Sequence, residues 1–294
     1  MGLWGVGPAS SWPFAFDPEE GLSDTVPAEE AELIAAAEEL AAPAPIAPPS
    51  LPAGYILAPI DSLRTLYAPR DPAASGRDVR TIHPSEVGAD IVVSGTFHDG
   101  RGPVGPVISG GRWLTSGVWP HGRGGVAVLA NGEIRIGYYP DAREASVRAA
   151  FEQPGVPLQE FMGGGALILE GGKAVSSEDL ETRQRFRGGA SAPQFEATAR
   201  HTLIGIHSDG RAYLIVETNS LRLADLQADL LRAGFTDVVM FDGGNAFGYE
   251  DRDRTLFGRL AGEYPPELSD AEVARLRGRR DVALTGFAIR TAPR

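Results

Sequence analysis

Cysteine is absent from the 294-residue chain, which excludes disulfides, thiolate metal sites and a cysteine nucleophile. No apolar run approaches the roughly 20 residues of a membrane-spanning helix. The N-terminus lacks a basic region followed by a continuous apolar segment, so no cleaved signal peptide is expected. The formal net charge of −12 argues against nucleic acid as a partner. We therefore expect no membrane span and a location in the cytoplasm or in a virion or other particle.

The composition predicts two parts. With 43% hydrophobic and 22% charged residues, the chain can bury one large core or two modest ones. Residues 1–53 are interpreted as an arm with aromatic residues, a short helix and a proline-rich linker at 43–52. Residues 54–294 form the predicted globular domain. The arm is either a tail with no partner or a segment that docks the domain to other subunits.

The stretch from Thr236 to Ala246 is the most informative one in the globular part. Four apolar residues read as a buried strand, which ends in Asp242, Gly243, Gly244 and Asn245. Paired glycines permit a positive φ or a close approach to a ligand. The Asp242 carboxylate is therefore either directed at a ligand or satisfies amides of its own turn.

The residues before this strand predict a hairpin and a helix. Residues 202–206 and 212–216 read as two strands joined by the turn Ser208-Asp209-Gly210. Residues 220–234 carry leucines at helical spacing, with Ser220 as the expected N-cap and Gly234 at the end. The predicted order is hairpin, helix, strand and Asp-Gly-Gly.

Other segments extend the same pattern. A short apolar strand at 90–97 leads into His98 and Asp99, and Asn131-Gly132 is a strong hairpin signal. The glycines 163–165 do not fit a nucleotide loop and are interpreted as a close backbone approach to a ligand or strand. These patterns predict an α+β fold of mixed, largely antiparallel sheets built from hairpins, with a few packed helices.

Taken in order, these motifs resemble those of the phosphodiester glycosidase family, which includes the "uncovering enzyme" N-acetylglucosamine-1-phosphodiester alpha-N-acetylglucosaminidase. The family's Asn-Gly-Gly-Phe-Phe-Asp motif is similar to Ser94–Asp99, and its Asp-Gly-Gly-Gly-Ser motif to residues 242–246. Its Arg-Thr pair corresponds to His201-Thr202, with Arg200 one residue earlier. The resemblance covers roughly residues 88–290.

The resemblance implies hydrolysis at a sugar carbon that bears a phosphodiester, with a carbohydrate or glycan phosphodiester as the ligand. Asp242 is then the carboxylate near the anomeric carbon, and His98 with Asp99 could form an acid–base pair. Glu217 is a second candidate carboxylate, or an exposed acid at a strand end. The candidate substrate-binding residues are Ser94, Thr96, Arg200, His201, Gly243, Gly244 and Asn245.

Two further alternatives stay open at the level of sequence. No cofactor is required, but Asp242, Asn245 and Asp99 offer the oxygen ligands that suit calcium or magnesium. The polar motifs differ from the family pattern, so the rival hypothesis is a carbohydrate-binding or structural protein without activity. Such a protein would dock through residues 1–53 into a larger assembly, for example a phage virion.

Overall fold

The computed structural model describes residues 48–68, 82–99, 102–186, 200–218, 221–243, 248–252, 255–257 and 285–292. All of these lie in the compact unit Ala47–Arg294. The predicted helix of the arm and the first half of its proline-rich segment, residues 43–47, lie outside the described residues. The predicted boundary after residue 53 therefore stays a prediction.

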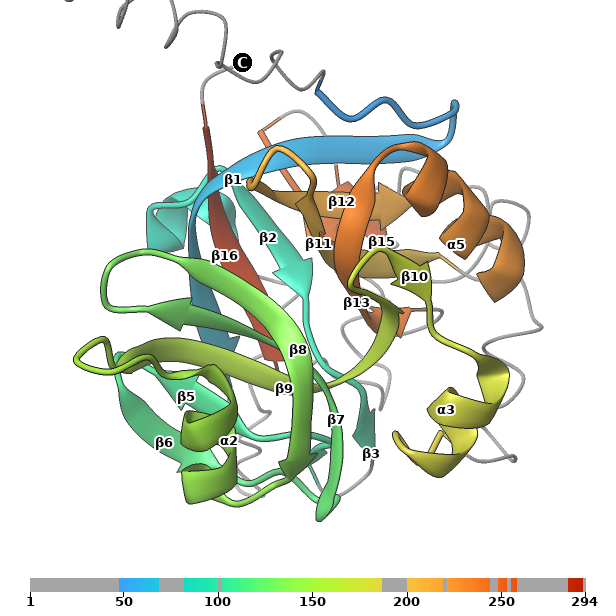
Figure 1. The fold of residues 1–294 in the computed structure, drawn as a ribbon. Coiled ribbons are helices and arrows are strands. Elements are labelled where there is room, and N and C mark those ends of the chain that lie inside the picture. The colour runs from blue at the N-terminus through green and yellow to red at the C-terminus, as the bar shows by residue number, and fades with distance from the viewer. Residues whose placement is uncertain are drawn as a thin grey trace, which may run out of the picture. The chain divides into compact units, whose positions relative to one another are not determined.

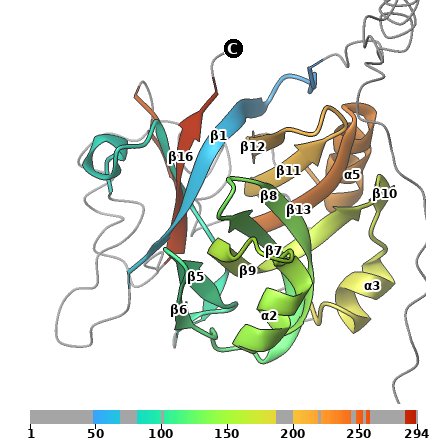
Figure 2. The same cartoon turned by 60° about the vertical axis from the view of Figure 1, so that its left-hand side comes forward.

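Strands make up most of the described chain, as Figures 1 and 2 show. The strands are β1 (Tyr55–Tyr67), β2 (Ile91–Ser94), β3 (His98–Asp99), β4 (Gly102–Pro103), β5 (Val107–Ser109), β6 (Arg112–Thr115), β7 (His121–Leu129), β8 (Ile134–Asp141), β9 (Leu158–Glu170), β10 (Lys173–Ala174), β11 (His201–His207), β12 (Ala212–Glu217), β13 (Phe235–Gly243), β14 (Gly248–Glu250), β15 (Thr255–Phe257) and β16 (Thr285–Thr291). The helices are the 3-10 turn η2 (Pro84–Val87), α2 (Glu144–Phe151), α3 (Ser177–Thr182) and α5 (Leu223–Arg232).

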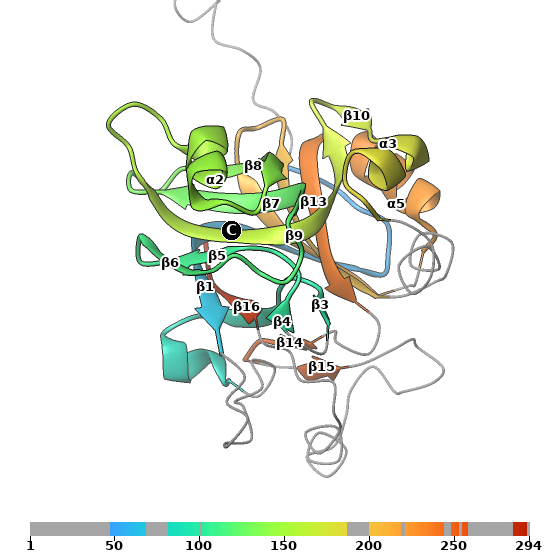
Figure 3. The ribbon, with the colours of Figure 1, turned by 90° about the horizontal axis from the view of Figure 1, so that it is seen from below.

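Most strands belong to one curled sheet, in the order β15-β14-β2-β16-β1-β12-β11-β13-β9-β5-β6 (Figure 3). Strand β1 joins its two parts, because its first half pairs with β12 and its second half pairs with β16. The predicted antiparallel sheets and small number of helices are confirmed. Strands so outnumber helices that the fold is mainly β rather than evenly α+β, and the pairs in the described sheet are antiparallel rather than mixed.

The predicted hairpin–helix–strand unit is confirmed, with one shifted boundary. Strands β11 and β12 pair in register around a turn in which Gly210 has a φ of 82°. Helix α5 begins after Arg222 instead of Ser220, which lies outside the described residues. The helix ends as expected, because Gly234 adopts a φ of 87° directly after the C-cap. Strand β13 then lies between β11 and β9.

The position of β13 in the middle of the sheet explains its apolar sequence. Val239 and Phe241 point into one core cluster, while Val238 and Met240 point into the other. Helix α5 packs its leucines against the second cluster, and α2 packs Val147 and Phe151 on a third cluster beside β8 and β9. A strand that is buried on both faces must be apolar at every position. The polar residues that end β13 therefore mark the place where this burial stops.

The three glycines 163–165 lie inside β9, so the predicted close approach to a neighbouring strand is confirmed. A Cβ on Gly164 would lie 2.3 Å from Oγ1 of Thr96, and a Cβ on Gly165 would lie 2.5 Å from Cγ2 of Val239. Gly164 also has a φ of 88°. Because these glycines have no side chain, the loop after β2 can lie directly against β9.

We expect Gly164→Ala to lower the free energy of unfolding by about 2–4 kcal/mol, because the new methyl group meets Thr96 and the positive φ is strained. Gly210→Ala is the matched control, since its φ is also positive but no atom lies within 4 Å of the added Cβ. Urea unfolding of both variants measures the difference. Equal losses in the two variants would contradict the close approach of Thr96 to β9.

Candidate active site

Four neighbouring strands bring their ends together in one row. His201, the first residue of β11, pairs with Gly243 of β13 on one side and with Glu217 of β12 on the other. Glu217 in turn pairs with Tyr55, the first residue of β1. Adjacent strands are about 4.8 Å apart, so the row places His201 and Glu217 close to the Asp-Gly end of β13. The place of Tyr55 in this row was not predictable from the sequence, because no local pattern shows which strand β1 pairs with.

The end of β2 approaches the same place from another part of the sheet. The Asp242 amide donates a hydrogen bond of 3.0 Å to the carbonyl of Gly95. Nδ1 of His98 lies 3.3 Å from Oδ2 of Asp242, and these side chains are 16% and 12% exposed. The imidazole that was predicted to work with Asp99 therefore contacts Asp242. The side chain of Asp99 lies outside the described residues, so the predicted pair is not tested.

Three ionisable side chains at the strand ends are buried. Glu217 is fully buried, Arg200 is 1% exposed and His201 is 3% exposed. The exposed-acid interpretation of Glu217 is therefore wrong, because β12 lies between β1 and β11 and is covered on both faces. The negative charge of Glu217 attracts the guanidinium of Arg200.

Burial separates the roles that Arg200 and His201 can have. It lowers the pKa of His201 to about 4, so this imidazole is neutral at pH 7. Burial also lowers the pKa of Arg200, whereas attraction to Glu217 raises it, and the guanidinium stays charged. Of these two candidate substrate-binding residues, Arg200 is the cation and His201 can offer only a neutral N–H.

Several buried polar atoms at this end of the sheet have no hydrogen-bond partner within the described ranges. They are Nε and Nη1 of Arg200, Nδ1 of His201, Oγ1 of Thr202 and Oγ1 of Thr96. Buried polar groups in folded proteins are nearly always paired. These donors and acceptors are therefore suited to a polar ligand.

The remaining predicted residues are placed as follows. Ser94 is buried as the last residue of β2, opposite Gly286 of β16. Gly243 ends β13, whereas Gly244 and Asn245 lie outside the described residues. Among the residues that the structure describes, no group of three or more histidine or acidic side chains could hold a metal ion. The predicted calcium or magnesium site at Asp99, Asp242 and Asn245 stays untested.

Comparison with known proteins identifies the family. The family model for phosphodiester glycosidases matches residues 87–249, which contain β2, the hairpins and the end of β13. The chain belongs to the phosphodiester glycosidase family.

One solved structure has a similar fold, and two others match more weakly. The catalytic domain of zebrafish N-acetylglucosamine-1-phosphodiester alpha-N-acetylglucosaminidase, auto-inhibited by its pro-peptide, matches with a TM-score of 0.51 and 16% identity, covering 79% of this chain and 73% of that one. A hypothetical protein from Synechocystis matches with a TM-score of 0.48 and 14% identity, covering 82% of this chain and 57% of that one. A putative exported protein from Burkholderia pseudomallei matches with a TM-score of 0.48 and 13% identity, covering 81% of this chain and 71% of that one. No curated protein sequence matches the chain. None of the helices in the described ranges is long and apolar enough to cross a bilayer.

The burial of His201 predicts a stability that depends on pH. A folded-state pKa of about 4 lies below the ordinary value of 6.5, so the unfolded chain binds the proton more tightly. The contribution of His201 to stability is intact above pH 6.5 and is lost as the pH falls toward 4. Between pH 7 and pH 5 the loss is about 2 kcal/mol.

This loss is measured by urea unfolding at both pH values for the wild type and for His201→Gln. We expect the variant to lack the part of the pH dependence that His201 causes. His121→Gln is the control, since His121 is exposed at the start of β7. An identical pH dependence in the wild type and His201→Gln would contradict the burial of a neutral imidazole.

Proposed function

We propose that this protein hydrolyses the bond between an anomeric carbon and the phosphate of a sugar-1-phosphodiester. The observation that carries the proposal is the contact between His98 and Asp242 at the end of β13, in a chain of the phosphodiester glycosidase family. A buried cation, Arg200, lies just before β11, the neighbour of β13. The site thus combines a carboxylate, an imidazole and a guanidinium within one family fold.

In the proposed reaction, a water oxygen attacks the anomeric carbon while the bond from that carbon to the phosphate oxygen breaks. The bonding electron pair leaves with the phosphate, which becomes a phosphomonoester. Asp242 stabilises the positive charge that develops on the sugar ring and orients the imidazole of His98. His98 accepts the proton of the attacking water. The products are a free sugar and a phosphomonoester.

Arg200 is the group that we assign to the phosphate oxygens. Its guanidinium is held at the strand end, and its Nε and Nη1 have no hydrogen-bond partner in the described part of the chain. A phosphodiester is already a good leaving group, so stabilising its charge matters more than protonating it. Glu217 keeps the guanidinium in place through its opposite charge and is a candidate second carboxylate.

A carbohydrate-binding or structural protein without activity is the alternative. Most of the arm on which its docking role was based, residues 1–47, lies outside the described residues. Its distinguishing property is binding of the sugar phosphodiester without turnover. The assays below separate the two functions, because they measure product release and ligand binding on the same protein.

We expect Asp242→Asn to reduce hydrolysis of a chromogenic sugar-1-phosphodiester by roughly 10²–10⁴-fold with an intact fold, because the amide cannot carry the stabilising charge. Asp237→Asn is the matched control, since this carboxylate lies on the same strand and accepts a turn hydrogen bond from the Gly171 amide. Circular dichroism checks the fold. Full activity in Asp242→Asn would remove this carboxylate from the mechanism. The same assay with EDTA, or with added calcium or magnesium, tests whether activity depends on a divalent cation.

We expect Arg200→Lys to raise KM for the phosphodiester by about tenfold or more, since lysine keeps the charge but not the planar fork of donors. Turnover of an uncharged nitrophenyl glycoside of the same sugar should be affected much less. The control is Arg211→Gln, an exposed arginine in the turn of the same β11–β12 hairpin. Equal losses on both substrates would show that Arg200 supports the fold rather than the phosphate.

A further inference from the structure

A second buried arginine lies close to the site and has no role in the proposed reaction. Arg123 lies on β7, opposite Tyr139 of β8, and is 3% exposed. The guanidinium carbon lies 3.7 Å from the ring centroid of Phe186 and 4.5 Å from that of Trp119. Attraction between the cation and the two aromatic rings holds the guanidinium in a fixed orientation.

Among the described residues, no acid balances the charge of Arg123, because no carboxylate there forms an ion pair with it. Burial raises the pKa of Tyr139, its partner across the β7–β8 ladder, so that phenol is neutral. Nη2 donates a hydrogen bond of 3.5 Å to the carbonyl of Arg185, whereas Nε has no partner there. Burial lowers the pKa of Arg123 to about 10, so it is still a cation at pH 7. A buried cation without a counter-ion is unfavourable unless an anion can reach it.

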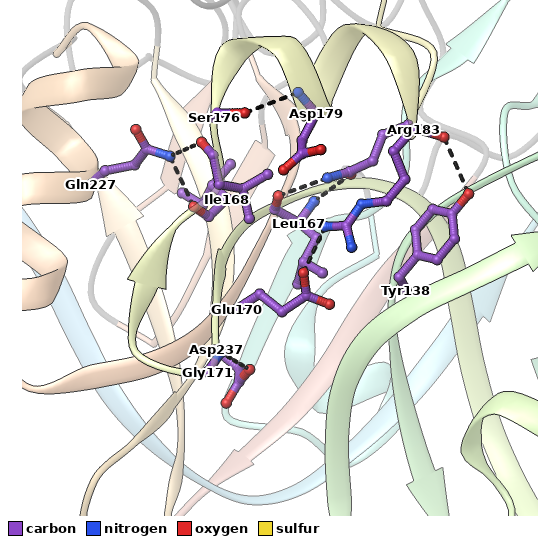
Figure 4. Close-up of polar contacts among 12 residues, drawn as sticks. Tyr138, Leu167, Ile168, Glu170, Gly171, Ser176, Asp179, Arg183, Gln227 and Asp237 are labelled. Carbon is purple, nitrogen blue, oxygen red and sulfur yellow. Dashed lines mark hydrogen bonds and ion pairs between the residues drawn. The ribbon is translucent and has the colours of Figure 1, made fainter.

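The segment that holds this arginine is firmly anchored. Figure 4 shows how α3 and its flanks are tied to β9 and α5. Ser176 caps α3, and the side chain of Gln227 donates to the carbonyls of Ile168 and Val175. The amide of Gln184 donates to the carbonyl of Leu167 and accepts from its N–H. These bonds fix the chain immediately before Arg185 and Phe186.

Arg185 itself is strained. Its φ of 59° makes it the one residue other than glycine with a left-handed conformation in the described chain. This conformation costs energy, and such residues concentrate at functional sites. The strained residue and the residue after it both contact the guanidinium of Arg123. The Arg185 carbonyl accepts a hydrogen bond from Nη2, and the Phe186 ring packs on the guanidinium.

The rings of Phe186 and Phe97 connect Arg123 to the residue before His98, a member of the proposed catalytic pair. The rings of Phe186 and Phe97 are in edge contact, with centroids 5.8 Å apart. Phe97 directly precedes His98, and both rings belong to the apolar cluster against which Trp119 packs. Trp119 is only half-buried, so it forms the outer wall of the group. An anion would approach Arg123 from the side of Trp119.

We propose that Arg123 is a phosphoryl-binding group beside the candidate active site, held in position by Trp119, Phe186 and the Arg185 carbonyl. A guanidinium that packs on aromatic rings keeps its N–H edge free for oxyanions, and its planar donors match phosphoryl oxygens. The binding site does not depend on hydrolysis. The assignment of the Arg123 site to an anionic part of the substrate, distinct from the phosphate that binds Arg200, does rest on the proposed function.

The test measures binding without turnover. Inorganic phosphate, dimethyl phosphate and acetate are titrated at constant ionic strength while tryptophan fluorescence and thermal unfolding are recorded. We expect phosphate to change the emission of the wild type and raise its Tm. Trp119→Phe should lose the emission change but keep the rise in Tm. Binding of dimethyl phosphate would identify the diester as the ligand form, whereas binding of phosphate alone would identify the monoester.

Variants of the arginine decide the question. Arg123→Gln should raise the Kd for phosphate by at least about tenfold, and Arg123→Lys should lie in between. Arg112→Gln, an exposed arginine on β6, should leave the Kd unchanged. Arg200→Gln separates the two cations, because a Kd controlled only by Arg200 would overturn the proposal. If Arg123→Gln does not fold, the Arg123→Lys comparison and the Trp119 emission test it.

Two results would also overturn the proposal. The first is a wild type in which neither phosphate nor dimethyl phosphate changes the emission of Trp119 or the Tm. The second is a lower Tm in Arg123→Gln that is the same in chloride and in phosphate, which would make the arginine a purely structural part of the aromatic group. A loss of hydrolysis in Asp242→Asn has no bearing on either measurement, so failure of the proposed function is recognised separately.

Discussion

The site depends on how closely backbones approach one another around β9. Gly164 and Gly165 allow the loop after β2 and the strand β13 to lie directly on β9, because any side chain there would overlap Thr96 or Val239. A side chain at Gly95 would likewise overlap Met162 of β9. The Gly95 carbonyl accepts a hydrogen bond from the amide of Asp242. Without these contacts His98 would not reach Asp242. The glycines are therefore structural in themselves, but they determine the geometry of the chemistry.

The distribution of charge follows from the same packing. A sheet that is covered on both faces gives its strand ends little access to water, so the charged groups there are only partly solvated. Attraction between Glu217 and Arg200 offsets part of the free energy that it costs to bury the Arg200 charge, whereas His201 stays neutral. This combination provides one cation and one uncharged donor beside the Asp242–His98 contact. Elsewhere in the described chain, Arg143, Arg222 and Arg252 form exposed ion pairs.

Local patterns were sufficient to predict much of the fold. The hairpins, α5 and the strand that ends in Asp242 were predictable because apolar periodicity and turn glycines are encoded over short stretches. The partner of His98 was not, because a contact between β2 and β13 depends on the order of strands in the sheet. The burial of Glu217, the position of Tyr55 beside it and the surroundings of Arg123 were not predicted for the same reason. Their neighbours come from distant strands, and no local signal identifies them.

The row of Tyr55, Glu217, His201 and Gly243 has a kinetic consequence. The row is complete only when β1 pairs with β12, the β11–β12 hairpin has formed, and β11 pairs with β13. The contact between Tyr55 and Glu217 forms late in folding, because these residues are far apart in sequence and a large loop must close. A chain in which β1 has not yet paired with β12 therefore lacks the complete row, and ligand binding during refolding reports this pairing.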